Sequence, residues 1–95
     1  MRRYEMVFIV HPDADEEALE NVIKDVEDLI KRNEGKVTKV EPWGLRRLAY
    51  PIMDQQEGRY VLMEFDSEPQ SIGEVERVLK LMEPMIRHLI IRMES

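Results

Sequence analysis

The 95-residue chain contains no cysteine, which excludes disulfides, thiolate metal ligands, iron–sulfur clusters and thiol catalysis. Its longest apolar run, Met6–Val10, is too short to cross a bilayer, and the arginines at the start are not followed by the long apolar region of a signal peptide. We therefore expect a soluble, cytoplasmic protein without membrane association. At this length we expect one domain, residues 1–95.

The chain also lacks an excess of positive charge. Fourteen Lys and Arg residues are outnumbered by twenty Asp and Glu residues, for a net charge of -6, which argues against an indiscriminate nucleic-acid binder. The charge is unevenly distributed. Segments 13–35, 53–66 and 67–85 carry -6, -3 and -2, whereas segments 1–12, 36–52 and 86–95 carry +1, +3 and +1. This distribution is compatible with an oriented contact to phosphates.

Hydrophobic periodicity predicts six elements, in the order strand, helix, strand, strand, helix, strand. Two-residue alternation indicates the strands, and apolar residues three and four apart indicate the helices. The predicted strands are Arg2–Val10, Lys36–Ile52 with a bend or bulge at residues 41–44, Arg59–Phe65 and Ile86–Met93. The predicted helices span about residues 14–33 and 71–83, and residues 53–57 form a polar loop.

The predicted helix ends rest on capping signals. Asp13 with Glu16, and Ser71 with Glu74, have the spacing of a capping box at a helix N-terminus. Gly35 is expected to end the first helix, and Pro84 stops the second.

The element order is that of the split βαβ, or ferredoxin-like, fold in the α+β class. It predicts a four-stranded antiparallel sheet with two helices on one face. The fourth strand should lie beside the first and the second beside the third, which leaves the second and fourth strands at the edges.

The sheet face without helices, called the open face below, is predicted from the alternation of each strand. The inward set is Tyr4, Met6, Phe8 and Val10, then Val61, Met63 and Phe65, then Leu89, Ile91 and Met93. The open face then carries Val7, Ile9, Tyr60, Leu62, His88 and Ile90, bordered by Arg3 and Arg92. An apolar patch bordered by cations favours a partner-protein interface, and scattered surface apolars are the alternative.

Arg46 and Arg47 lie in the predicted second strand, at an edge of the sheet. Arginines in this position can contact phosphates, or they can guard the edge against aggregation with other strands. Both roles are compatible with each other.

The segment Gly44–Ile52 reads Gly-Leu-Arg-Arg-Leu-Ala-Tyr-Pro-Ile and resembles the signature of the bacterial ribosomal small-subunit protein six family. The opening Met1–Glu5 and the closing Ile86–Arg92 are also similar to that family, so the resemblance covers nearly the whole chain. It implies a structural component of the cytoplasmic small ribosomal subunit. It further implies binding to the central domain of the small-subunit rRNA as a heterodimer with small-subunit protein eighteen.

The resemblance, carried over position by position, implies a set of rRNA-binding residues. One further arginine is added because the last strand is basic. The set is Arg2, Arg3, Arg46, Arg47, Arg87 and the added Arg92. Two features depart from the family. Residues 53–57 carry no cation, and the chain ends at Ser95 without the extension that some members have.

Other functions on this fold fit less well. An acylphosphatase-like hydrolase needs a phosphate-binding loop after the first strand, but His11–Asp15 has no glycine and is acidic. An RNA-recognition motif needs several exposed aromatics on its third strand, where only Tyr60 points outward. A regulatory domain that dimerises through its open sheet face stays as the alternative. We expect no enzymatic activity and no small-molecule substrate.

The remaining notable side chains are expected to be structural. His11 and His88 lack metal-ligand spacing, so we expect no metal and no cofactor. Trp43 is expected to cover one end of the core, although it could stack on a base. Tyr4 and Tyr50 are expected to pack under the helices.

Overall fold

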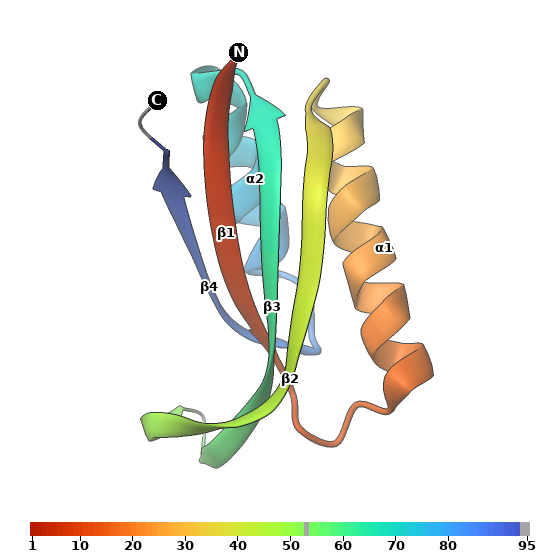
Figure 1. Ribbon diagram of the computed structural model, residues 1–95, viewed down its shortest axis with the longest axis vertical. Coiled ribbons are helices and arrows are strands. Elements are labelled where there is room, and N and C mark those ends of the chain that lie inside the picture. Colours follow the sequence, from red (N-terminus) through yellow and green to blue (C-terminus); the bar gives the residue numbers. More distant parts are fainter. Residues whose placement is uncertain (53, 94–95) are drawn as a thin grey trace.

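The computed structural model describes residues 1–52 and 54–93, and its elements follow the predicted order (Figure 1). They are β1 (Arg2–Val10), α1 (Glu16–Arg32), β2 (Lys36–Ile52), β3 (Gln55–Ser67), the 3₁₀ helix η1 (Pro69–Ser71), α2 (Ile72–Leu79) and β4 (Met85–Arg92). The sheet has the order β2-β3-β1-β4, and every neighbouring pair is antiparallel. The predicted fold class and strand order are confirmed. Met53 of the predicted loop and the terminal Ser95 lie outside the described residues.

The core forms between the sheet and both helices, and the central strands β1 and β3 supply its floor. Met6, Phe8 and Val10 are fully buried and Tyr4 is nearly so, as the alternation of β1 predicts. The same face of β3 contributes the fully buried Val61, Met63 and Phe65, also as predicted. Against them pack Val22, Val26, Leu29 and Ile30 of α1 and Val75 and Leu79 of α2. Each buried aliphatic or aromatic side chain stabilises the fold by about 1.5–3 kcal/mol.

The N-terminus of α1 differs from its prediction by two residues. The N-cap is Asp15, whose Oδ1 accepts a hydrogen bond of 2.8 Å from the Ala18 N–H, and the helix begins at Glu16. The predicted cap, Asp13, lies before the helix, and its N–H donates to Nδ1 of His11. An Asp three residues before an N–H in the first turn satisfies one of the free donors there.

The C-terminus of α1 closes in a Schellman motif. The N–H of Gly35 donates to the Ile30 carbonyl at 2.8 Å, and the N–H of Glu34 donates to the Lys31 carbonyl at 3.0 Å. The left-handed residue is Glu34, with φ 65°, and not Gly35 as the sequence suggested. Gly35 is required for space instead. A Cβ at this position would lie 2.7 Å from the carbonyl oxygen of Asp66 on β3.

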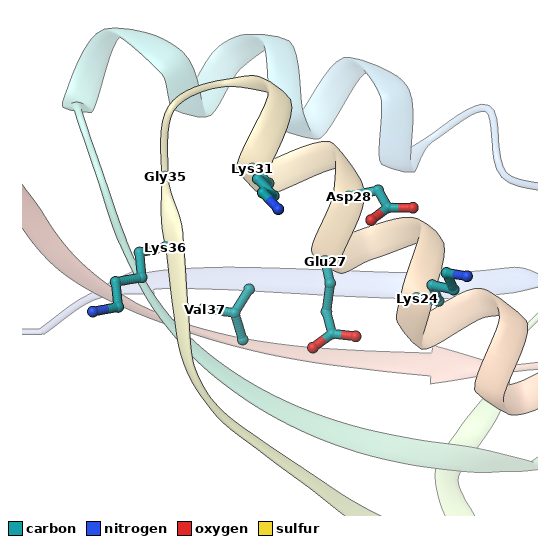
Figure 2. A pocket seen from close by; sticks show the side chains of 7 residues that line it. All are labelled: Lys24, Glu27, Asp28, Lys31, Gly35, Lys36 and Val37. Carbon is teal, nitrogen blue, oxygen red and sulfur yellow. The ribbon is translucent and has the colours of Figure 1, made fainter.

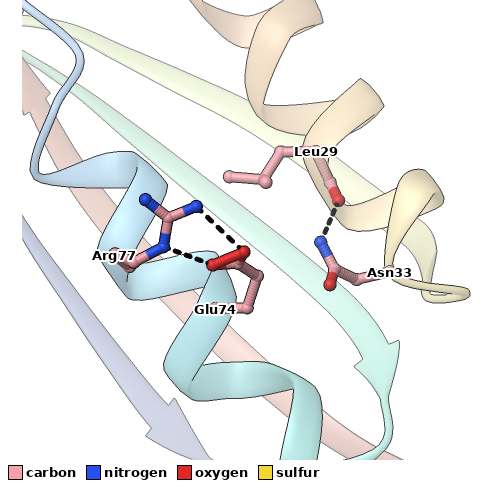
Figure 3. Close-up of polar contacts among 4 residues, drawn as sticks. All are labelled: Leu29, Asn33, Glu74 and Arg77. Atoms are coloured by element: carbon pink, nitrogen blue, oxygen red, sulfur yellow. Dashed lines mark hydrogen bonds and ion pairs between the residues drawn. The ribbon is translucent and has the colours of Figure 1, made fainter.

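The second helix is shorter than predicted and begins differently. Ser71 caps no N–H of α2, because η1 precedes the helix and puts Ser71 in a helical conformation. The helix ends at Leu79, well before Pro84. On its surface Arg77 donates two hydrogen bonds to Glu74, which hold the pKa of that carboxyl below its usual value (Figure 3).

The β2–β3 hairpin is longer than predicted, and it extends past the end of β1 and bends across the end of the sheet (Figure 1). Ile52 pairs with Gln55, so most of the predicted polar loop belongs to β3. The bend expected at residues 41–44 is present as a bulge between Pro42 and Gly44, and Gly44 has φ 86°. A second irregularity, between Val37 and Lys39, had no sequence signal.

Gly35→Ala should destabilise the fold by about 1–3 kcal/mol, because the new methyl group would collide with the backbone of β3. Gly73→Ala is the matched control. Nothing lies within 4 Å of a Cβ there, and in a helix this change should stabilise by up to about 1 kcal/mol. Urea unfolding of both variants measures the difference. Equal effects of the two substitutions would contradict the packing of Gly35 against β3.

Candidate functional site

The register of β4 shows that its side chains point to the opposite faces of the sheet from those predicted. His88 lies opposite Phe8, Ile90 opposite Met6 and Arg92 opposite Tyr4, and paired residues in an antiparallel sheet point to the same side. His88, Ile90 and Arg92 therefore share the helix face, and their assignment to the open face is wrong.

The open face of β4 carries the alternate residues instead. Leu89 lies opposite Val7 and Ile91 opposite Glu5, and they are 52% and 49% exposed, although both were expected in the core. Aliphatic residues occupy both sets of alternate positions on this strand, so alternation cannot choose between them. The pairing with β1, which includes an irregularity between Ile9 and Val10, sets the register.

The open face therefore carries one connected apolar surface over three strands. In its central row, Leu62 and Leu89 flank Val7. We call the following six residues the open-face patch: Val7, Ile9, Tyr60, Leu62, Leu89 and Ile91. Leu62 and Ile9 are buried even though no helix covers them, whereas Leu89 and Ile91 at the sheet edge are accessible. An accessible apolar surface of this kind is typical of an interaction site.

An aromatic stack borders the open-face patch at the base of the hairpin. Tyr60 lies opposite Ile9, and the Trp43 ring stacks on it with centroids 6.2 Å apart and an interplanar angle of 16°. The guanidinium carbon of Arg46 lies 5.2 Å from the Trp43 ring centroid. Trp43 is thus on the open face, and the expectation that it covers the end of the core is wrong.

The far part of the hairpin also reaches the open face. Nη1 of Arg87, at the start of β4, donates a hydrogen bond of 2.8 Å to the Tyr50 hydroxyl near the end of β2. Tyr50 is 58% exposed and does not pack under the helices. Because Arg87 lies opposite Ile9, this contact joins the two outer strands across the width of the sheet.

The predicted rRNA-binding arginines do not form one cluster. Arg3 on the open face is paired with Asp66 at 3.2 Å, and Arg2, opposite the buried Ser67, is on the helix side with Arg92. Arg46 and Arg47 point to opposite sides of the hairpin, because adjacent strand residues alternate. Within the described chain, Arg46, Arg47 and Arg87 form no ion pair with a carboxylate.

The groove between α1 and the start of β2 has a mixed charge pattern (Figure 2). On its α1 side the carboxylates of Glu27 and Asp28 lie between Lys24 and Lys31. On β2, Lys36 points away from the helix and Val37 points toward it. Such a lining favours neither an anion nor a cation. Among the described residues, no three His, Asp or Glu side chains gather as metal ligands would.

His88 lies partly buried between β4 and α2. Burial lowers its pKa below the usual value, Lys80 lowers it further, and Glu76 opposes the shift. The neutral form is therefore favoured in the folded chain.

Comparison with known proteins agrees with this geometry. A family model described as Ribosomal protein S6 matches residues 3–92. The small ribosomal subunit protein bS6 of Moorella thermoacetica is 45% identical over 95 residues, covering 100% of this chain and 97% of the relative. That of Caldanaerobacter subterraneus is 42% identical over 95 residues and covers 100% of both. The crystal structure of 30S ribosomal protein S6 from Thermotoga maritima has a TM-score of 0.91 at 34% identity, covering 97% of this chain and 87% of that one.

The fold, the signature segment and these relatives define a protein of the small ribosomal subunit. The chain belongs to the ribosomal protein S6 family. The resemblance stated from the sequence is thereby confirmed, as is the ribosomal location. Neither helix in the described part of the chain is long and apolar enough to span a bilayer.

Truncating two neighbours on β4 should test the corrected register. Ile90→Ala should destabilise the fold by about 2 kcal/mol, because Ile90 packs on the core. Leu89→Ala should cost less than about 1 kcal/mol, because Leu89 is half exposed. Chemical unfolding of both variants provides the measurement. If Leu89→Ala destabilised the fold more than Ile90→Ala, the side-chain orientation expected from alternation would be correct instead.

His88 should make the fold sensitive to acid. Its folded pKa lies below the usual 6.5, so its contribution to stability is complete above pH 6.5 and is lost as the pH falls toward the folded pKa. The free energy of unfolding should therefore decrease more steeply between pH 7.5 and about 5.5 in the wild type than in His88→Gln. Above pH 7.5 the difference between the two proteins should be constant. Parallel curves at all pH values would contradict the assignment.

Proposed function

We propose that this chain is a structural, non-enzymatic protein of the small subunit that binds the central domain of the small-subunit rRNA as a heterodimer with small-subunit protein eighteen. The observation that supports it is the open sheet face. Leu89 and Ile91 form the accessible part of the open-face patch there. Arg46 and Arg87, which pair with no carboxylate of the described residues, lie at its hairpin end.

The apolar part of this face suits a protein partner. Leu89 and Ile91 lie on the edge strand β4, beside the buried Leu62 and Ile9, so a partner could extend the existing apolar surface. An apolar interface centre surrounded by polar groups is the usual arrangement for protein–protein contact. His88 and Ile90 face the helices and have no part in this interface.

The hairpin end suits RNA. Arg46, Arg47 and Arg87 carry charge that no carboxylate of the described chain neutralises, whereas Arg3 is paired with Asp66. We therefore assign the main phosphate contacts to these three arginines, and minor roles to Arg2, Arg3 and Arg92. The most acidic segment, residues 13–35, forms α1 on the opposite face, so an approaching RNA is turned toward the open face.

Reconstitution on a central-domain rRNA fragment together with small-subunit protein eighteen tests the proposal. Replacing Arg46 and Arg47 with Gln should weaken binding and lower the slope of log affinity against log salt by about one for each phosphate that the variant no longer neutralises. Arg77→Gln, on the surface of α2, is a control that also removes a positive charge, and it should leave the slope unchanged. Leu89→Glu should abolish the heterodimer in solution while the fold persists.

Other results would contradict the proposal. If the affinity of the wild type did not depend on salt concentration, the proposed phosphate contacts would be contradicted. Loss of more than about 2 kcal/mol of stability in the Arg46 and Arg47 variant would assign those residues a structural role, since surface changes cost far less. A homodimer that forms through Leu89 and excludes protein eighteen would favour the dimerising-domain alternative.

A further inference from the structure

The bulge in β2 changes where Trp43 points. Pro42 lies opposite Val61 and Gly44 lies opposite Tyr60, so Trp43 is an extra residue without a partner on β3. The bulge depends on Gly44, whose φ of 86° is strained for other residues. Bulges commonly redirect a side chain in this way. Here the redirected indole lies on the open face against Tyr60.

Trp43 in turn contacts Arg46. The guanidinium carbon lies 5.2 Å from the ring centroid, within the range of a cation–π contact. Arg46 lies opposite Gly58, which has no side chain, and the space for a Cβ there is occupied by Cγ2 of Ile9. No cross-strand side chain therefore competes with the indole for the guanidinium.

We propose that Trp43 is a positioning residue for RNA binding, which holds the Arg46 guanidinium where it meets a backbone phosphate and does not itself stack on a base. The inference rests on the proposed function of the open face. A guanidinium that stacks on a ring uses its flat face and keeps its in-plane N–H groups available for a phosphate. Because the contact with Trp43 restrains Arg46 before RNA binds, less side-chain entropy is lost on binding.

If Trp43 stacked on a base instead, its contribution to binding would depend on Arg46 in a different way. An indole that stacks on a base contributes binding through its own ring, whatever residue occupies position 46. An indole that positions Arg46 contributes only while the arginine is present. A double-mutant cycle separates these two roles.

The experiment measures affinity for the central-domain rRNA fragment, with small-subunit protein eighteen present, for the wild type, Trp43→Leu, Arg46→Gln and the double variant. Trp43→Leu should weaken binding by about two- to fivefold, the range of an exposed cation–π contact. The double variant should bind no more weakly than Arg46→Gln alone. Trp43→Phe, which retains an aromatic face, should keep most of the affinity.

Two results would overturn the inference while leaving the proposed function intact. One is an equal loss from Trp43→Leu with and without Arg46→Gln, which would indicate base stacking. The other is no loss from Trp43→Leu at all. If the wild type does not bind the fragment, the proposed function fails instead.

Fluorescence of the free protein checks the contact without RNA. Trp43 is the only tryptophan in the chain, so the emission spectrum reports on its ring alone. Arg46→Gln should shift that emission, whereas Arg77→Gln should not. An unchanged spectrum in Arg46→Gln would contradict the contact from which the inference starts.

Discussion

The rest of the structure depends on the alternation of β1 and the register of its two neighbours. Tyr4, Met6, Phe8 and Val10 supply one apolar side. Strand β3 pairs with β1 from Arg2 to Val10, and β4 pairs with it from Tyr4 to Val10. A slip of one residue in either pairing would move a full set of side chains to the other face. This one strand therefore determines which face the helices cover and which face they leave open.

The acidic composition of the chain conceals an uneven distribution of charge between the two faces of the sheet. Carboxylates are concentrated on α1, on the covered side of the sheet, while Arg46 and Arg87 lie at the hairpin end of the open side. The long β2–β3 hairpin contacts both arginines. Its bulge directs Trp43 toward Arg46, and its far part contacts Arg87 through Tyr50. In the proposed function, the hairpin is thus the element that adds RNA contacts to a simple two-layer fold.

Much of this architecture could be predicted from the sequence, because β1 and β3 have strongly asymmetric alternation. The facing of β4 could not, since Leu89 and Ile90 are equally apolar and only the pairing with β1 distinguishes them. The arginines could be named from the family resemblance of the opening, signature and closing segments. Their partners could not, because the pairing of Arg3 with Asp66 and of Arg87 with Tyr50 joins residues far apart in the chain. A bend or bulge at residues 41–44 could be predicted, but not that it would direct Trp43 to the open face, against Tyr60.

Hydroxyl-radical footprinting of the free chain and of the assembled small subunit tests the central claim most directly. The claim is that the open sheet face is the buried interface. Leu89, Ile91 and Trp43, which are accessible in the free chain, should become protected on assembly. Leu81, which is 69% exposed just after α2, should remain reactive. Protection of Leu81 together with unchanged reactivity of Leu89 and Ile91 would contradict the account.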